Sequence, residues 1–261
     1  MAKHFAWLCL LWVWCAATPV PGQTVVINEI MYHPPSTNLL EEWFEIYNPG
    51  TNAVDLSGWQ VTKGVEFTFP TNTVIGVGGY LVVAADRATF TNHYPTVSNF
   101  VAGWIGDLGH SLELSDNLGQ VVNSIQFFND GDWAPRILGL NGVVGALDSF
   151  GGLGWEAFAL HDGYGASLEL INPNLPNIYA HNWGSNRATN STPGRVNSIA
   201  TNNVAPFIAE VGHNPLIPQP TDPVTIVARI VDEHTNGLSV ALRWRLAGAA
   251  SSALRSIGLR R

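Results

Sequence analysis

The stretch VVINEIMYHPPSTNLLEEWFEIYNPG, residues 25–50, decides the fold of this chain. In an extended chain, alternate residues point to opposite faces, and between Val25 and Met31 both faces carry apolar residues. Residues 42–47 also divide into two alternating sets, with Phe44 and Ile46 on one face and Trp43 and Tyr47 on the other. A period of two predicts β-strands rather than helices. The tripeptide Asn48-Pro49-Gly50 then ends the second strand, because proline presets φ and glycine accepts a positive φ.

The same period continues beyond this stretch and predicts an all-β fold. Tyr80 to Ala85 is a nearly continuous apolar run, as expected for a strand buried on both faces. Asp86 offers an N-cap for one short helix that must end before Pro95. Further strands are predicted at residues 57–61, 65–69, 111–114, 121–127 and 167–170.

Composition excludes two classes of protein. The chain has 261 residues, of which 46% are hydrophobic and only 12% charged, and it contains 26 Gly and 16 Pro. This is too apolar for a disordered chain and is typical of a turn-rich globular protein. The formal net charge of -8 argues against a nucleic-acid partner, because phosphate backbones attract basic surfaces.

The N-terminus, residues 1–22, reads as a secretory signal peptide. Lys3 precedes an apolar run from Phe5 to Ala17, which is shorter than the roughly 20 residues that span a bilayer. Cleavage is expected after Thr18 or Gly22. Both cysteines lie in this segment, so the mature chain is expected to have no disulfide and no Cys-type zinc site. No other apolar run approaches this length, so no transmembrane segment is expected after cleavage. The predicted location is therefore secreted or cell surface, in a bacterium.

The remaining chain is predicted to form two domains. Residues 24–170 are expected to make one β-sandwich with a Gly-rich insertion at about 134–166, and residues 171–203, rich in Asn, Pro, Ser and Thr, a linker. Strands expected within residues 204–246, with a hairpin at Asn236-Gly237, are too few to close a second sandwich. Residues 247–261 have an abrupt basic composition that reads as an exposed tail or, preferably, as the trace of a truncated or frameshifted reading frame.

Five short motifs resemble the lamin tail domain. They are residues 26–32, 45–50, 54–59, 67–70 and 78–83, in that order and at roughly the family's spacing. The resemblance implies an immunoglobulin-like β-sandwich, here followed by a partial second immunoglobulin-like domain. In long bacterial relatives such a module precedes further immunoglobulin-like domains and a spore-coat-type kinase-like domain.

The motif residues have a structural interpretation. Asp55 to Trp59 should form a turn in which Asp55 accepts backbone N–H bonds, Gly58 frees the backbone and Trp59 enters the core. Glu29 and Glu45 lie on predicted strands that could pair, and two facing carboxylates can support acid–base or metal chemistry. The preferred interpretation is that both are structural and hydrogen-bonded. The motif residues singled out on these grounds are Glu29, Glu45, Asn48, Asp55, Gly58 and Trp59.

Local chemistry motifs are absent from the sequence. It has no Gly-x-Ser-x-Gly, His-Glu-x-x-His, P-loop or EF-hand pattern, so neither a catalytic residue nor a cofactor is predicted. Asp130 and Asp132 are candidate ligands for Ca²⁺, with a solvated turn as the alternative. Three tryptophans in loop-like context are candidates for stacking on sugars, with core packing as the alternative: Trp133, Trp155 and Trp183.

These observations predict a non-catalytic exported β-sandwich for adhesion, scaffolding or protein interaction, as the N-terminal part of a larger surface protein. Its expected partner is an extracellular protein or a polysaccharide. Two alternatives remain: a carbohydrate-binding module that uses the loop tryptophans, or the non-catalytic end of a truncated enzyme with a spore-coat-type kinase-like domain.

Overall fold

The computed structural model divides the chain into two compact units. One comprises Pro19–Asn202 and the other Met1–Thr18 with Asn203–Arg261. The backbone is described for residues 11–14, 25–134, 136–140, 143–144, 155–157, 159–187, 190–219, 222–234, 238–244 and 255–259. Side chains are described for residues 25–134, 159–187, 190–219, 222–234 and 238–242.

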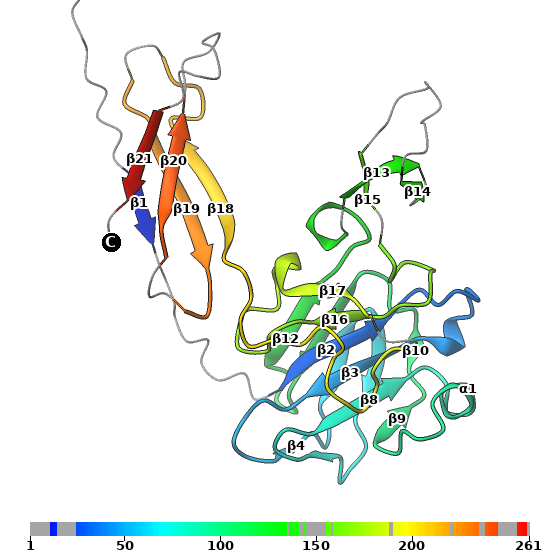
Figure 1. The fold of residues 1–261 in the computed structure, drawn as a ribbon. Helices are drawn as coiled ribbons and strands as arrows, with labels where there is room; N and C mark the ends of the chain where they lie inside the picture. The colour runs from blue at the N-terminus through cyan, green and yellow to red at the C-terminus, as the bar shows by residue number, and fades with distance from the viewer. Residues whose placement is uncertain are drawn as a thin grey trace, which may run out of the picture. The chain divides into compact units, whose positions relative to one another are not determined.

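The larger unit is a sandwich of two main sheets (Figure 1). The first has the order β17 (Trp183–Ser185), β16 (Leu168–Leu170), β2 (Val26–Met31), β3 (Trp43–Tyr47), β8 (Tyr80–Ala84) and β9 (Phe100–Ala102). The second has the order β10 (Ile105–Gly106), β6 (Val65–Thr68), β5 (Gln60–Lys63), β11 (Ser111–Ser115) and β12 (Val121–Gln126).

Apolar side chains from both sheets form one buried cluster, which includes Ile27, Ile46 and Leu112. Every residue of β2 is buried, as the apolar residues on both of its faces predict. The backbone N–H of Ile27 also donates to Asn123 Oδ1 of β12 at 3.0 Å, which joins the two sheets through a polar contact. The all-β prediction is confirmed.

Short elements complete this unit. The predicted helix is α1 (Arg87–His93), and the side chain of its N-cap, Asp86, accepts the N–H of Thr89 at 2.8 Å. No helix in the described ranges is long and apolar enough to cross a bilayer. The other elements are the 3₁₀ helices η1 (Leu39–Glu41), η2 (Gly131–Trp133) and η3 (Ala180–Asn182), and the strand pair β4 (Val54–Asp55) and β7 (Val74–Ile75).

The Gly-rich insertion contains a small sheet of its own. Its strands are β13 (Arg136–Leu140), β14 (Val143–Val144) and β15 (Trp155–Ala157), in the order β14-β13-β15. The rest of the insertion before Ala159 lies outside the described residues, apart from Ala134.

The prediction of a linker at 171–203 is wrong. Strand β17 lies within that range and pairs with β16, and the residues around Thr192 are hydrogen-bonded to the strands of the first sheet. The compact unit extends to Asn202. The polar residues that made this segment look like a linker instead include donors to buried carboxyl groups, as Thr192 shows.

In the second unit β1 (Leu11–Trp14), β19 (Thr225–Val231) and β18 (Phe207–Asn214) form one sheet, and β20 (Val240–Trp244) pairs with β21 (Arg255–Leu259). The segment set apart as an aberrant tail thus contains a strand. The turn at Asn236-Gly237 and, apart from β1, the proposed signal peptide up to Gly22 lie outside the described residues.

Candidate functional site

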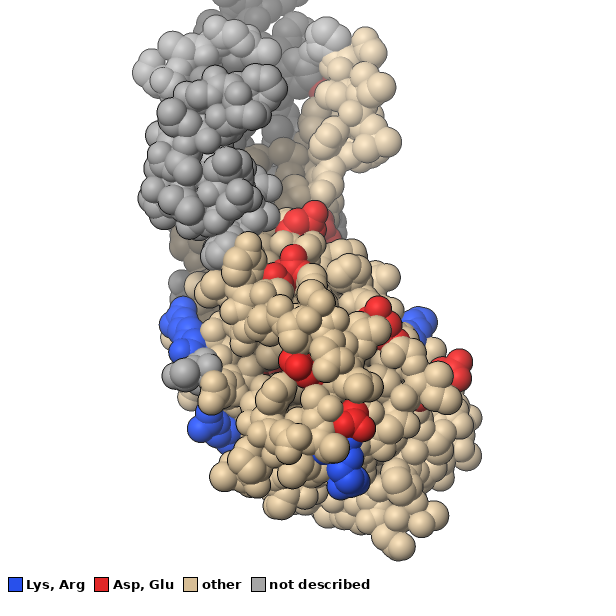
Figure 2. All heavy atoms as spheres, turned by 90° about the vertical axis from the view of Figure 1, so that its right-hand side faces the viewer, with Lys and Arg blue, Asp and Glu red and all other residues tan. Residues whose placement is uncertain are grey.

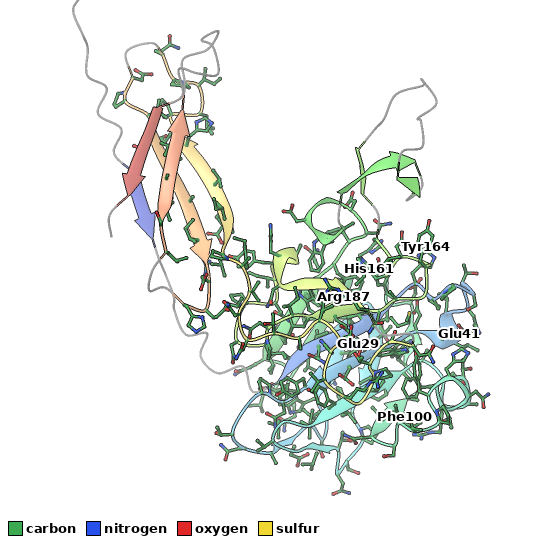
Figure 3. All side chains as sticks on the ribbon, in the orientation of Figure 1. Glu29, Glu41, Phe100, His161, Tyr164 and Arg187 are labelled. Carbon is green, nitrogen blue, oxygen red and sulfur yellow. The ribbon has the colours of Figure 1, made fainter. Side chains whose placement is uncertain are left out.

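Three glutamates lie side by side across the first sheet. Glu45 of β3 is opposite Glu29 of β2, and Glu29 is opposite Glu169 of β16. Directly opposed residues of neighbouring strands project from the same face of a sheet, so the three carboxyl groups gather there. All three are fully buried, at 0% exposure, and Glu29 is labelled inside the unit in Figure 3. This arrangement is called the glutamate row below.

The segment 191–199, called the strap below, covers the glutamate row. It supplies one backbone N–H to each glutamate: Thr192 to Glu29 Oε1 at 2.8 Å, Gly194 to Glu45 Oε2, and Ile199 to Glu169 Oε2 at 3.1 Å. Backbone donors that bind carboxyl oxygens satisfy both partners in a buried setting. The strap is therefore fixed to the sheet by three separate contacts.

Side chains give each glutamate of the row a further hydrogen bond. Ser167 Oγ donates to Glu29 Oε1 at 2.5 Å, and Asn28 Nδ2 donates to Glu45 Oε1 at 2.9 Å. Asn186 Nδ2 donates to Glu169 Oε1 at 2.6 Å. The row is thus a buried polar network between the first sheet and the strap.

The position of Thr192 requires a proton on this network. Its Oγ1 lies 2.9 Å from Glu29 Oε2 and 2.5 Å from Glu169 Oε1, but a hydroxyl group has one hydrogen to donate. One of the two carboxyl groups must therefore donate to Thr192. Burial raises the pKa of Glu29 to about 8, and burial together with the Glu29 charge raises the pKa of Glu45 well above its usual value. A protonated Glu29 satisfies the geometry.

The remaining motif residues also hold the fold together. Asn48 is buried, its Nδ2 donates to the Ile75 and Gly76 carbonyls, and its Oδ1 accepts the N–H of Gly50. Asp55 Oδ1 accepts the Ser57 N–H at 2.9 Å. Gly58 has a φ of 76° and Trp59 is buried in the core.

A cavity of about 330 Å³ lies beside the loop that follows β2. Its most buried ionisable group is Glu42, which is 1% exposed and accepts the Leu108 N–H through Oε2 at 3.2 Å. Burial raises the pKa of Glu42 to about 7. This space is called the His33–Glu42 cavity below, and it is lined by Tyr32, His33, Pro34, Thr37, Leu39, Glu42, Asp107, Gly109 and His110.

Neighbouring contacts hold the lining in place. His33 Nδ1 lies 2.5 Å from Asp162 Oδ1, and Asn129 Nδ2 donates to Asp162 Oδ2 at 2.7 Å. The Tyr32 ring packs against His110 at a centroid distance of 5.8 Å, and its buried hydroxyl has no partner among the described residues. Sequence reasoning missed this cavity, because residues far apart in the chain form it and no local pattern joins them.

The side chains of two of the three candidate tryptophans, Trp133 and Trp183, are described, and their rings are neighbours. Trp183 is 5% exposed, and its Nε1 donates to the Asn177 carbonyl at 2.7 Å, so it cannot offer a free face to a sugar. Trp133 is half-buried, with its ring 6.3 Å from that of Trp183. The side chain of Trp155 lies outside the described residues. Core packing, the alternative weighed for these residues, is the role of Trp183.

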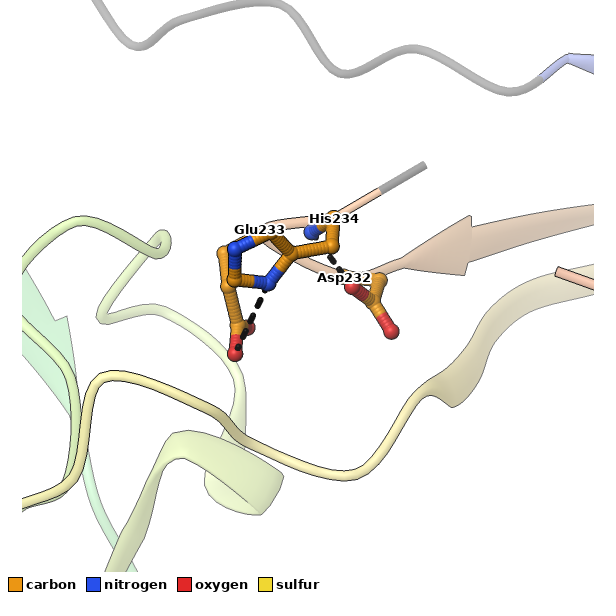
Figure 4. Close-up of side chains that lie close together, drawn as sticks. All are labelled: Asp232, Glu233 and His234. Atoms are coloured by element: carbon orange, nitrogen blue, oxygen red, sulfur yellow. Dashed lines mark hydrogen bonds and ion pairs between the residues drawn. The ribbon is translucent and has the colours of Figure 1, made fainter. Parts of the chain in front are cut away.

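The predicted calcium ligands Asp130 and Asp132 are exposed at the start of η2, and that site remains a prediction. The structure gathers a different set, Asp232, Glu233 and His234, whose ligand atoms lie within 4.8 Å of one another (Figure 4). Glu233 Oε1 accepts the Val204 N–H at 2.6 Å, and Asp232 accepts the backbone N–H of His234. The signal that could have found them is their succession in the chain, Asp-Glu-His.

Sequence reasoning found two members of the glutamate row and missed the third. Glu169 lies in the second copy of the tetrapeptide Ser-Leu-Glu-Leu, which begins first at Ser111, so the repeat contained a signal. The two copies differ in environment: Glu113 is paired with Lys63 Nζ at 2.6 Å, whereas Glu169 is fully buried. A tetrapeptide does not reveal that difference.

Comparison with known families agrees with this geometry. Residues 18–129 match the family model of the Lamin Tail Domain. No curated protein matches the chain. The resemblance seen in the five motifs is confirmed, and the chain contains, over residues 18–129, a lamin tail domain, a non-enzymatic immunoglobulin-like β-sandwich of the kind that serves in protein interaction.

Proposed function

We propose that this protein is an exported, non-catalytic β-sandwich module for adhesion, scaffolding or protein interaction on the cell surface, and forms the N-terminal part of a larger surface protein. Its partner is an extracellular protein or polysaccharide.

The glutamate row is the observation that supports this proposal most directly. Facing carboxyl groups with raised pKa values are a usual sign of acid–base chemistry. Here Glu29, Glu45 and Glu169 bind the strap, and none of them lines the His33–Glu42 cavity. The residues that most resemble catalytic groups therefore hold the fold together.

The second unit supports the idea of a larger assembly. Five apolar side chains of β18, β19 and the turn between them are at least 44% exposed: Ile208, Val211, Leu216, Ile217 and Val227. Neighbouring exposed apolar residues, such as Leu216 and Ile217, are a feature of surfaces that pack against a partner. They are where a neighbouring domain or an extracellular protein would bind.

The surface charge agrees with a partner other than nucleic acid. On the face shown in Figure 2, the basic side chains drawn in colour are scattered, lie among acidic side chains and uncharged surface, and form no continuous stripe. A continuous basic stripe is what phosphate binding requires. The carbohydrate alternative loses support, because Trp183 is buried.

Export can be tested directly. The full chain with a C-terminal tag is expected to appear outside the cytoplasm, with a new N-terminus after Thr18 or Gly22. A variant that lacks residues 1–22 is expected to stay inside. An unprocessed N-terminus on a cytoplasmic protein would overturn the proposal of export.

Binding can be tested by photo-crosslinking on intact cells, with mass spectrometry of the adducts. A discrete adduct of the tagged chain with one extracellular protein or polysaccharide is expected, and Leu216→Asp should reduce it. Leu118→Asp is the matched control, because Leu216 and Leu118 are 81% and 79% exposed but lie in different units. The absence of an adduct, or equal losses in both variants, would contradict the proposal.

A further inference from the structure

The His33–Glu42 cavity holds two carboxyl groups that the described structure does not neutralise. Glu42 uses Oε2 for the Leu108 N–H, and its Oε1 has no hydrogen-bond donor among the described residues. Asp107 Oδ1 accepts the N–H of Gly109 at 2.9 Å, and no ion pair of the described residues includes Asp107 or Glu42. A nearly fully buried carboxyl group with a free oxygen needs a cationic or hydrogen-bonding partner.

The lining contains no lysine or arginine to supply that partner. Its two histidines have other contacts: His33 Nδ1 lies 2.5 Å from Asp162 Oδ1, and the His110 ring packs against Tyr32 and Phe128 and is in no ion pair of the described residues. The same lining presents apolar surface from Pro34, Leu39 and the Tyr32 ring. A cavity with acidic groups and apolar walls suits a cation on an apolar stem.

Distances distinguish such a cation from a bare metal ion. Metal ions bind protein oxygen and nitrogen atoms at about 2.0–2.6 Å, so their ligands must lie close together. In the described ranges, three such side chains come within 4.8 Å of one another at Asp232–His234, and those of the cavity do not. An ammonium group on a flexible stem, with three rotatable N–H donors, can reach one carboxyl group while its stem contacts the walls.

We propose that the His33–Glu42 cavity binds an alkylammonium group, the side chain of a lysine on a partner protein. This inference rests on the proposed interaction function and specifies the chemistry of the partner. Glu42 binds the ammonium group, Asp107 adds attraction at the mouth, and Leu39 and Pro34 contact the methylene stem.

The test is a titration of the full chain with Nα-acetyl-lysine methylamide, followed by two-dimensional ¹H–¹⁵N NMR. Saturable shifts are expected at His33 and at 107–110. Nα-acetyl-norleucine methylamide, which has an apolar side chain without the ammonium group, should give none. Glu42→Gln should weaken binding about tenfold or more, as expected for the loss of a charge-assisted hydrogen bond.

Glu41→Gln is the matched control, because Glu41 is the preceding glutamate and does not line this cavity. It should leave binding unchanged. Asp107→Asn keeps an acceptor for Gly109 on an exposed side chain, so it tests the acidic requirement even where Glu42→Gln fails to fold. It should weaken binding severalfold.

Three results would overturn the inference: no saturable shift with the lysine probe, equal binding of the norleucine probe, or equal losses in Glu41→Gln and Glu42→Gln. Displacement of the probe by Zn²⁺ or Ca²⁺ with direct metal shifts at His33 would assign the cavity to a metal instead. The two tests can fail separately. If the crosslinked adduct forms on cells but the lysine probe does not bind, this inference is overturned and the proposed function stands. If the lysine probe binds but no adduct forms on cells, the proposed function is overturned and the inference about the cavity stands.

Discussion

Replacing Glu29 with glutamine should make the protein more stable in mildly alkaline solution. In the glutamate row, a protonated Glu29 accepts from Ser167 and from the Thr192 N–H through Oε1, and donates from Oε2 to Thr192 Oγ1. A glutamine side chain offers the same acceptor and, in its amide NH₂, the same donor. It differs from Glu29 in that it cannot ionise.

The sign and size follow from the pKa of Glu29, which burial raises from 4.5 to about 8. Between these two values the folded state binds more protons at Glu29 than the unfolded state does. The stabilisation from Glu29 is therefore fully present below pH 4.5 and is lost as pH rises to about 8. The loss is about 1.4 kcal/mol per pH unit for a single proton. Glu45, whose pKa is also raised, adds a loss of the same sign.

Urea unfolding of wild type and Glu29→Gln at several values between pH 5 and pH 9 measures this effect. Between pH 5 and about pH 8 the variant should lose free energy of unfolding less steeply with pH, by about one proton, so it should become more stable than wild type within this range and remain so above it. Glu66→Gln is the control, because Glu66 is an exposed glutamate on β6, and it should leave the pH slope unchanged. An identical slope in wild type and Glu29→Gln would refute a protonated Glu29 in the folded state.

Three further substitutions test individual contacts. Gly64→Ala should cost more than about 2 kcal/mol in urea unfolding, because φ is 78° and the new Cβ would lie 2.3 Å from the Ser111 carbonyl oxygen; a neutral effect would contradict that geometry. Asp86→Ala should cost about 1 kcal/mol in thermal unfolding, because the Thr89 N–H loses its cap, and Asp86→Asn should restore most of it. Trp183→Ala should cost roughly 3–5 kcal/mol and leave retention on insoluble polysaccharides unchanged; weaker retention by a folded variant would revive the carbohydrate hypothesis.

The strands of the sandwich were predictable because their information is local. Residues 25–31 carry apolar side chains on both faces, which predicts a strand that is buried on both sides, and all six residues of β2 are buried. Asp86 lies at the start of α1, where its side chain has a donor to accept. In both cases the residues that determine the structure are close together in the chain.

The strap and the His33–Glu42 cavity were not predictable, because their partners are distant in the sequence. Thr192 binds Glu29, and Asp162 binds His33, across more than a hundred residues. A linker and a strap can both be rich in Asn, Pro, Ser and Thr, so composition does not distinguish them. The difference is that the donors of a strap bind buried acceptors, here the three glutamates, and those acceptors are brought near only by the fold.

The glutamate row also explains why the compact unit extends beyond the family match. The match ends at residue 129, but Glu29 and Glu45 lie inside it and receive the N–H groups of Thr192 and Gly194 from outside it. Buried carboxyl groups without donors destabilise a core strongly. The sandwich therefore needs the strap, which lies inside the compact unit that ends at Asn202 and outside the family match that ends at residue 129.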